Sequence, residues 1–496
     1  MTDVLLASAN YMALDPKQLR KRRPYPPLAT LYAASTLRQA GLSVSVFDAT
    51  LAPSEEAFFA HLAGARPRIV ALYEDNFNFL SKMCLGRMRE AAQAMARASR
   101  EAGARVLAAG PDVTDRPALY LDHGVDYALV GEPDHTLVEL ARILLGRQAG
   151  DPETVAGIAV TGGGPAEPVR RTAPRPPERD PDVFPPPAWD LVDLEAYRSV
   201  WLEAHGRFSL NLATTRGCPF HCNWCAKPIW GQRYAIHSPG RVAEEMAHLK
   251  RQFRPDHVWF ADDIFGLRPA WVVDFARELG ARGGRLPFTV QTRADLLTPE
   301  SVRALADAGC EDVWLGAESG SQRILDAMEK GTTVDDVVAA RWRLAEAGIR
   351  ANFFLQFGYP GETFHDILAT VRLVRDLLPD DIGISVAYPL PGTRFYDRVR
   401  EELGRKTNWT DSDDLEMLFR GPYQTALYRR LHGLLHDELT IRLAMARGTA
   451  SAADLEVVLA EWERLEAAER DLRTDAPVRL HTPTASARPD LSRDWN

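Results

Sequence analysis

Three of the five cysteines in this chain fall within eight residues, at Cys218, Cys222 and Cys225. Their spacing is Cys-x3-Cys-x2-Cys, and three thiolates so placed can bind three corners of a cubane [4Fe–4S] cluster and leave one iron open. The open iron can bind the amino and carboxylate groups of S-adenosylmethionine, and an electron from the cluster can then break the sulfonium bond. The spacing therefore predicts a metal site for radical chemistry.

Two other kinds of site could use the same cysteines. A zinc site would add His221, although structural zinc sites usually take four ligands in paired spacings. An electron-transfer ferredoxin would need a fourth cysteine nearby, but Cys84 and Cys310 stand alone, and we expect both to be structural. An odd, clustered set of cysteines is a poor disulfide framework, so we expect the protein to work in the reducing cytoplasm.

The elements that must position these cysteines form two series. In residues 1–148, short apolar runs alternate with helical stretches at 28–39 and 85–102, which is typical of an open, doubly wound (Rossmann-like) parallel sheet. Such sheets bind ligands at the carboxyl ends of their strands. The expected strands are 4–7, 44–47, 69–72, 106–109 and 127–130.

A second series follows a Pro/Gly-rich stretch, which we interpret as a linker over residues 149–200. Residues 201–400 contain six strand–helix units, which predict a partial (β/α)6 TIM-type barrel with its chemistry at the carboxyl ends of the strands. Residues 401–496 are predicted to form helices that cover the barrel mouth, followed by a polar tail. The expected barrel strands are 209–214, 257–262, 287–291, 312–317, 351–357 and 382–387.

Composition excludes several classes of protein. The formal net charge of −9 argues against a protein that binds nucleic acid mainly through charge. The opening residues MTDVLLASAN lack the basic start and the apolar length of a secretory signal. No apolar run reaches about 18 residues, so we expect no membrane span.

The cysteine loop, TTRGCPFHCNWC, resembles that of the radical S-adenosylmethionine superfamily. Further segments resemble the group of that superfamily that carries an N-terminal cobalamin-binding domain and includes cobalamin-dependent radical methyltransferases and anaerobic magnesium-protoporphyrin monomethyl ester cyclases. In the barrel these are AESGSQRILDAMEKGTT, GYPGET and YPLPGT. In the first 150 residues they are RPYPPLATLYAASTLRQAG, AAGPDV and DYALVGEPDHT.

The resemblance assigns residues to S-adenosylmethionine. Trp224 takes the position beside the adenine, Glu318 and Ser319 match a pair that contacts S-adenosylmethionine, and Gly358 lies in a turn near the adenine. Glu318 could instead cap the next helix. Arg293 could pair with a carboxylate of S-adenosylmethionine or of the substrate, or form an ordinary internal salt bridge. Asp263, in an Asp-Asp pair that follows a strand, is a further catalytic candidate.

The resemblance also implies cobalamin, bound without the usual histidine. His61 and Gly64 have the spacing of the motif Asp-x-His-x-x-Gly, but Phe59 occupies the position of its aspartate. The motif is therefore absent. Cobalt would then have water, another side chain or nothing beneath it. The alternative is that the sheet is purely structural. The expected cobalamin contacts lie in loops that follow the strands and are Ser81, Gly110, Pro111, Gly131 and Glu132.

The leading functional hypothesis is a methyltransferase that uses both cofactors to methylate an unactivated carbon of a small molecule. It would need an electron donor such as flavodoxin or ferredoxin. An oxidative cyclase with the same cofactors is the alternative, and a non-catalytic cobalamin or redox sensor is the second alternative. Methylthiolation fits poorly, because that family has three further cysteines in its N-terminal domain and only Cys84 precedes residue 200 here.

Overall fold

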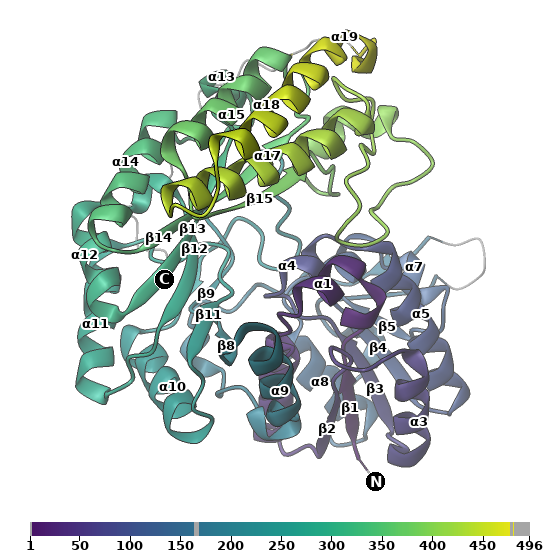
Figure 1. Ribbon diagram of the computed structural model, residues 1–496. Coiled ribbons are helices and arrows are strands. Elements are labelled where there is room, and N and C mark those ends of the chain that lie inside the picture. Colours follow the sequence, from purple (N-terminus) through teal and green to yellow (C-terminus); the bar gives the residue numbers. More distant parts are fainter. Residues whose placement is uncertain (1, 163–167, 477–479, 481–496) are drawn as a thin grey trace.

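A computed structural model describes residues 2–162, 168–476 and 480. An N-terminal sheet domain lies beside a half-barrel, and a C-terminal group of helices lies at the far edge of the half-barrel (Figure 1). The doubly wound sheet, the partial barrel and the C-terminal helical region are confirmed.

The N-terminal sheet has the strand order β2-β1-β3-β4-β5-β6-β7, and its first five strands are parallel. Alternate residues of β1 enter different cores, Val4 and Leu6 on one face and Leu5 and Ala7 on the other. Helices therefore cover both faces of this sheet. The five parallel strands are β1 (Val4–Ala7), β2 (Val44–Phe47), β3 (Ile69–Tyr73), β4 (Arg105–Ala109) and β5 (Tyr127–Leu129). The helices are α1 (Pro16–Lys21), α2 (Leu28–Gln39), α3 (Glu55–Ala65), α4 (Phe79–Lys82), α5 (Gly86–Glu101), α6 (Pro111–Asp115), α7 (Ala118–Leu121) and α8 (Asp134–Leu144).

The stretch 149–200, expected as a linker, contributes to the sheet instead. β6 (Ile158–Val160) pairs antiparallel with β5, and β7 (Arg170–Arg171) pairs antiparallel with β6. These short strands cover the edge that β5 would otherwise leave unpaired. The stretch ends in α9 (Leu194–His205), and residues 163–167 lie outside the described residues.

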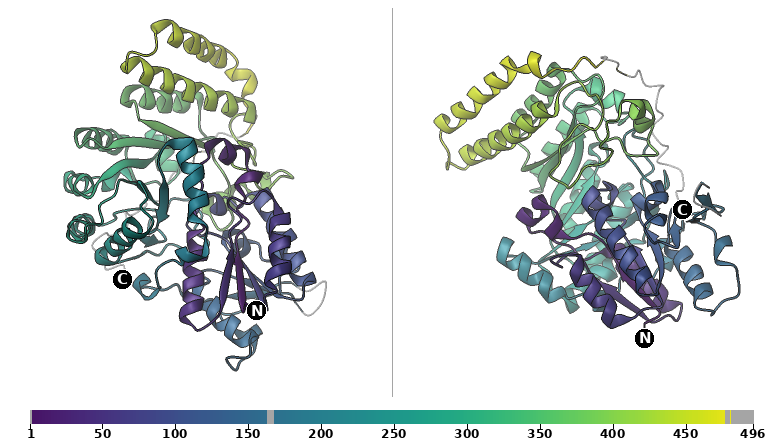
Figure 2. Two further views of the ribbon diagram at one scale, coloured as in Figure 1. Left: turned by 60° about the horizontal axis from the view of Figure 1, so that its bottom comes forward. Right: turned by 90° about the vertical axis from the view of Figure 1, so that its right-hand side faces the viewer.

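The second unit is a six-stranded parallel half-barrel with the order β15-β14-β13-β12-β11-β8. Its helices lie in a row outside the sheet (Figure 2, left). The strands are β8 (Ser209–Leu212), β11 (His257–Phe260), β12 (Phe288–Thr292), β13 (Cys310–Glu318), β14 (Arg350–Phe357) and β15 (Asp381–Val386). The helices are α10 (Pro239–Gln252), α11 (Pro269–Arg282), α12 (Pro299–Ala308), α13 (Gln322–Ala327), α14 (Val334–Glu346), α15 (Phe364–Leu377) and α16 (Arg394–Val399).

The C-terminal helices do not cover the barrel mouth, which corrects our expectation. α17 (Thr425–Ala446) packs against α15 and β15 at the edge of the sheet, with α18 (Ala452–Ala467) and α19 (Glu469–Leu472) beyond it (Figures 1 and 2). The segment before α17 instead reaches the N-terminal domain, where the Trp409 carbonyl accepts a hydrogen bond from the Gly86 amide. The predicted tail lies largely outside the described residues. None of the helices that the structure describes is long and apolar enough to cross a membrane.

Candidate functional site

The cysteine loop leaves the carboxyl end of β8 and is closed at its base by a two-stranded ladder. β9 (Thr215–Arg216) pairs antiparallel with β10 (Ala235–Ile236). Gly217, with a φ of 83°, makes the turn between the ladder and the first cysteine. A Cβ atom there would overlap the Arg233 carbonyl oxygen, so only glycine fits. The ladder fixes where the loop starts and returns.

The three cysteines of the loop are free and partly accessible. Cys218 and Cys222 pack against a cluster formed by Phe220, Tyr234, Ile264, Leu267 and Leu296. Burial raises the pKa of the Cys225 thiol to about 12 and also raises the pKa of Cys218, while the Lys227 ammonium acts in the opposite direction on both. His221 is exposed. Three thiols without His221 match a cluster with one open iron better than a four-ligand zinc site.

A buried ion pair stands beside the cysteine loop. Lys330 Nζ is 2.6 Å from Glu318 Oε1, both side chains are over nine-tenths buried, and Nζ lies 5.9 Å from the centre of the Trp224 ring. Glu318 has a φ of 59° at an irregularity in the β13–β14 register, a left-handed conformation that residues with a side chain rarely adopt. The indole Nε1 of Trp224 is buried without a partner, as expected of a group that waits for a ligand. These residues fit S-adenosylmethionine.

Sequence reasoning missed Lys330, although it lies within the AMEKGTT segment that matched the family. A lysine in a loop after a short helix gives no periodic signal, and only the fold brings it back to Glu318. The Glu318 carboxylate raises the pKa of Lys330 against the opposing effect of burial, so the ammonium stays charged.

Two further predicted residues, Arg293 and Asp263, take partners within the protein. Arg293 forms two 3.0 Å hydrogen bonds with Asp295, donates to the Lys330 carbonyl at 2.6 Å, and stacks on the Phe220 ring. Arg293 therefore forms an internal salt bridge. Its contacts with Phe220 and with the Lys330 carbonyl connect the cysteine loop to Lys330. Asp263 pairs with Lys82 of α4, across the domain boundary.

Ser319 and Gly358 belong to the frame around the site. Ser319 is fully buried, and its hydroxyl lies 3.2 Å from that of Thr370. Gly358 has a φ of 78°, and a Cβ atom there would come within 3.0 Å of Met417. Both positions constrain the backbone at the ends of β13 and β14.

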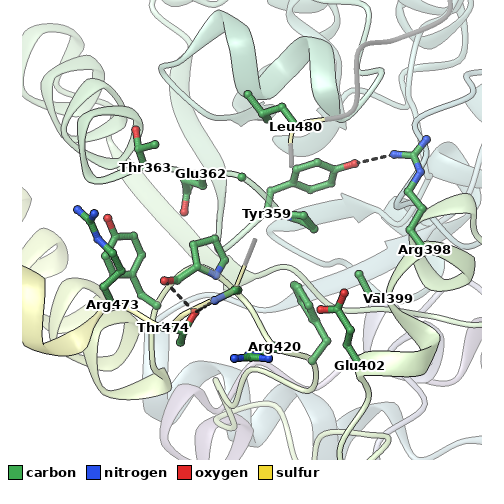
Figure 3. A pocket seen from close by; sticks show the side chains of 16 residues that line it. Tyr359, Glu362, Thr363, Arg398, Val399, Glu402, Arg420, Arg473, Thr474 and Leu480 are labelled. Atoms are coloured by element: carbon green, nitrogen blue, oxygen red, sulfur yellow. Dashed lines mark hydrogen bonds between the residues drawn. The ribbon is translucent and has the colours of Figure 1, made fainter. Parts of the chain in front are cut away.

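A cavity of about 460 Å³ opens at the turn after β14 (Figure 3). The Tyr359 hydroxyl donates to Asn223 of the cysteine loop at 2.9 Å, so Tyr359 connects the lining of the cavity to that loop. Glu362 also lines the cavity. One carboxylate oxygen accepts from the Gly358 amide at 2.6 Å, the other is buried without a partner, and burial raises the pKa of Glu362 to about 8.

The predicted cobalamin contacts lie at the carboxyl edge of the N-terminal sheet, but not all in loops: Ser81 lies in the short helix α4 and Pro111 in α6. The Ser81 hydroxyl and the Asn76 amide oxygen are buried without partners, which fits loops that bind a polar cofactor. Gly110 approaches so closely that a Cβ atom would lie 2.7 Å from that of Glu74, and Pro111 begins α6 behind it. The amide of Gly131 donates to the Thr114 hydroxyl at 3.2 Å.

Glu132 serves the interface between the two units. Arg216, in the stem of the cysteine loop, donates to Glu132 at 2.6 Å and to Asp134 at 3.0 Å, and all three side chains are at least nine-tenths buried. Trp230, at the other end of the loop, donates to the same Glu132 oxygen at 3.0 Å. The Arg216 guanidinium also lies 3.9 Å from the Phe184 ring centre. One carboxylate thus ties both arms of the cysteine loop to the N-terminal sheet.

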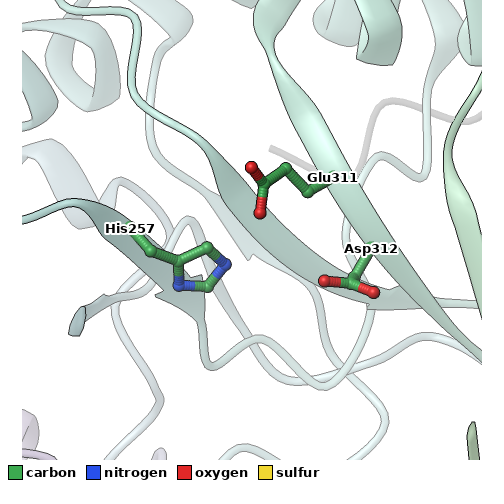
Figure 4. A group of neighbouring side chains, drawn as sticks. All are labelled: His257, Glu311 and Asp312. Carbon is green, nitrogen blue, oxygen red and sulfur yellow. The ribbon is translucent and has the colours of Figure 1, made fainter. Parts of the chain in front are cut away.

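Another group of ligand-type side chains, His257, Glu311 and Asp312, lies at the opposite end of the barrel strands (Figure 4). The two ring nitrogens of His257 each lie 2.8 Å from a hydroxyl, of Ser209 and of Thr289, and burial lowers its pKa to about 3. A neutral histidine with both nitrogens engaged is a structural group.

Replacing Arg216 tests the interface. We expect Arg216→Met to destabilise the protein by about 3–5 kcal/mol, because Glu132 and Asp134 would remain buried without their cation. Arg38→Met, which removes an exposed ion pair with Asp190, should cost under about 1 kcal/mol. Urea unfolding of both variants measures the difference, and equal midpoints would refute the role of Arg216.

Glu362 predicts a pH dependence of stability. Its pKa in the folded protein lies above the ordinary 4.5, so between pH 4.5 and about 8 the unfolded chain releases a proton that the folded chain keeps. The free energy of unfolding of the wild type should therefore fall as the pH rises in this range. For each pH unit it should lose about 1.4 kcal/mol more than the free energy of unfolding of Glu362→Gln. Urea titrations at pH 5 and pH 8 test this. Glu402→Gln, at an exposed glutamate, should show the same pH dependence of stability as the wild type. If Glu362→Gln also showed the wild-type pH dependence, the prediction would be wrong.

Comparison with known proteins agrees with this geometry. Residues 212–374 match the radical SAM superfamily, and residues 22–141 match the B12 binding domain. An uncharacterised methyltransferase of Pyrococcus horikoshii is 29% identical over 309 residues, which are 61% of this chain and 65% of that protein. The anaerobic magnesium-protoporphyrin IX monomethyl ester cyclase of Rubrivivax gelatinosus is 28% identical over 291 residues, 58% of this chain and 50% of that protein. The matched part thus spans less than two thirds of either relative.

Among solved structures, the radical S-adenosylmethionine methyltransferase TsrM of Kitasatospora setae shares the fold. It superposes with a TM-score of 0.65 at 22% identity, over 81% of this chain and 76% of that chain. The two domain matches cover the two α/β units that meet at Arg216. The chain therefore pairs an N-terminal B12-binding domain with a domain of the radical SAM superfamily.

Proposed function

We propose that this protein is a cobalamin-dependent radical S-adenosylmethionine methyltransferase that acts on an unactivated carbon of a small molecule. One observation carries the proposal: the cysteine loop and the loops of the B12-binding domain meet at one buried junction. Arg216, two residues before Cys218, bonds to Glu132 at 2.6 Å, and Glu132 follows directly on the Gly131 turn. Two cofactors held in these loops would face each other.

The residues of the barrel have distinct roles in this proposal. Cys218, Cys222 and Cys225 would hold the [4Fe–4S] cluster, with the fourth iron left for S-adenosylmethionine. Trp224 would stack on the adenine, and Glu318 and Lys330 would bind the charged amino and carboxylate groups. When bound, the cluster and S-adenosylmethionine supply an electron and a carbon radical, and cobalamin supplies the methyl group.

The N-terminal domain would hold cobalamin through its loops. Ser81 and Asn76 offer buried hydrogen-bonding atoms without partners, and the turns at Gly110 and Gly131 have positive φ angles, 152° and 79°, which glycine adopts without strain. The pair Lys82–Asp263 connects this region to the loop that follows β11 and carries Asp262 and Asp263. These contacts would orient the two cofactors and exclude water from between them.

The relatives support methyl transfer, since both the Pyrococcus protein and TsrM are described as methyltransferases. The similarity to a magnesium-protoporphyrin ester cyclase favours ring formation as the second candidate. We further propose that the protein works in the reducing cytoplasm and receives its electron from flavodoxin or ferredoxin, because free thiols and a low-potential cluster both need reducing conditions.

Anaerobic reconstitution tests the proposed cofactors. We expect about four irons, four sulfides and one corrinoid for each chain, with cleavage of S-adenosylmethionine to 5′-deoxyadenosine. Cys222→Ala should lose the cluster and the cleavage while circular dichroism stays unchanged. Cys310→Ala, at a buried cysteine at the opposite end of the barrel, should retain both. Cleavage that persists in Cys222→Ala would refute the cluster assignment.

The mass of the product separates the two candidate reactions. A methyltransferase adds one methylene unit to its substrate and converts a second S-adenosylmethionine to S-adenosylhomocysteine, whereas a cyclase adds no carbon. Mass spectrometry with methyl-deuterated S-adenosylmethionine should show label in the product. Cofactor binding without any cleavage of S-adenosylmethionine would favour a sensor.

A further inference from the structure

The two faces of the barrel sheet differ sharply in chemistry. The registers of the six strands align their residues, so that alternate residues of every strand lie on the same face of the sheet and the residues between them lie on the other. On the face beneath the helices these are apolar, for example Val258, Leu315 and Phe353, and they belong to the main core. On the inner face they are polar, aromatic or glycine, and they comprise Asn211, Trp259, Gln291, Trp314, Gly316, Asn352, Phe354, Gln356, Gly383 and Ser385. Closed barrels of this type usually fill their interior with bulky branched apolar residues.

The amino-terminal end of the inner face is closed by polar side chains. His257 lies at this end of the sheet near Asp312 (Figure 4), and its ring nitrogens bond to Ser209 and Thr289, as described above. Asp312 accepts two hydrogen bonds from Arg350, with Nε at 2.7 Å. These groups form their hydrogen bonds within the protein and close the amino-terminal end. A ligand would therefore reach the inner face from its carboxyl end, on the side of the cysteine loop.

An aromatic pair lies in the middle of the inner face. The rings of Trp314 and Phe354 stack with centroids 4.6 Å apart and planes at 23°. Both rings are only half-buried, and neither packs against any apolar core cluster of the described residues. Gly383 makes room for them, because a Cβ atom there would lie 3.0 Å from the Phe354 ring. A stacked aromatic pair outside the core is a surface to which a flat molecule can bind.

Polar atoms without partners lie on the same face. Gln356, two residues beyond Phe354 on β14, is 4% exposed, and its Oε1 has no hydrogen-bond partner. The Oδ1 atom of Asn211 on β8 is also buried and unpartnered, while its amide nitrogen donates to Pro26. Both atoms accept hydrogen bonds, and a buried acceptor without a partner is costly unless a ligand supplies the donor.

The inner face leads directly to the radical site. Gly316, in register with Phe354, leaves the space that Lys330 and Glu318 occupy, since a Cβ atom there would come within 2.7 Å of both. A molecule that lies on the aromatic pair therefore lies next to the groups assigned to S-adenosylmethionine.

From these contacts we infer that the substrate is a planar aromatic molecule that carries an N–H or O–H donor and lies on the Trp314–Phe354 pair with its donor toward Gln356. The inference rests on the proposed function for the identity of the site, but the binding surface is independent of the chemistry. It excludes sugars and aliphatic substrates as the preferred class.

Binding of small probes to the reconstituted holoenzyme tests this substrate class. The probes are indole (planar, with an N–H donor), benzofuran (the same shape without a donor) and cyclohexanol (a donor without a planar ring). In ligand-observed NMR, indole should bind with the highest affinity, benzofuran with a lower affinity and cyclohexanol with the lowest. We expect indole to bind about fivefold more tightly than benzofuran. Equal affinities for indole and cyclohexanol would overturn the inference.

Variants locate the binding. Trp314→Leu should weaken indole binding about tenfold. Trp342→Leu, the same change at a tryptophan on α14 that is 54% exposed, should leave it unchanged. Gln356→Leu should abolish the preference for indole over benzofuran, and Gln148→Leu, at an exposed glutamine, should keep it. Unchanged binding in Trp314→Leu would overturn the inference.

Two readouts separate this inference from the proposed function. Corrinoid content and cleavage of S-adenosylmethionine in the same samples report on the proposed function alone. A holoenzyme that cleaves S-adenosylmethionine but binds indole equally well in Trp314→Leu refutes only the substrate class. A protein without corrinoid or cleavage refutes only the proposed function when its indole binding still depends on Trp314.

Discussion

The buried guanidinium of Arg216 connects the two halves of this protein. It bonds to Glu132 and Asp134 of the N-terminal domain and lies two residues before Cys218. Because a buried charge is tolerated only with well-placed partners, the two domains can dock in only one arrangement at this point. The position of the cysteine loop relative to the loops at Ser81, Gly110 and Gly131 follows from it.

A second buried ion pair organises the barrel side of the site. Lys330 and Glu318 lie beside Trp224, and Arg293 holds the Lys330 backbone through its carbonyl oxygen. The left-handed conformation of Glu318 and the missing Cβ of Gly316 are both needed to fit this pair against the sheet. Strain and small residues thus concentrate where charged groups must be held in an apolar setting.

The half-barrel gives the protein an inner surface of unusual composition. Its outer face is an ordinary apolar core, whereas its inner face combines stacked aromatic rings with unpaired amide oxygens. A closed eight-stranded barrel would fill this space with side chains. Six strands, closed at the amino-terminal end by His257 and Asp312, instead leave one face for a ligand and one for packing.

The sequence by itself determined both sheets and predicted the cysteine site, because strand–helix alternation and Cys-x3-Cys-x2-Cys spacing are local patterns. It missed β6 and β7, which are too short for a periodic signal, and it placed the C-terminal helices at the barrel mouth. Only the tertiary structure decided which charges meet: Glu132 with Arg216, Glu318 with Lys330, and Arg293 with Asp295. Glu132 and Arg216 are 84 residues apart, and Glu318 and Lys330 are separated by a short helix, so the spacing of residues along the chain does not predict these contacts. The inner face likewise emerged only when strand registers placed Trp314 beside Phe354.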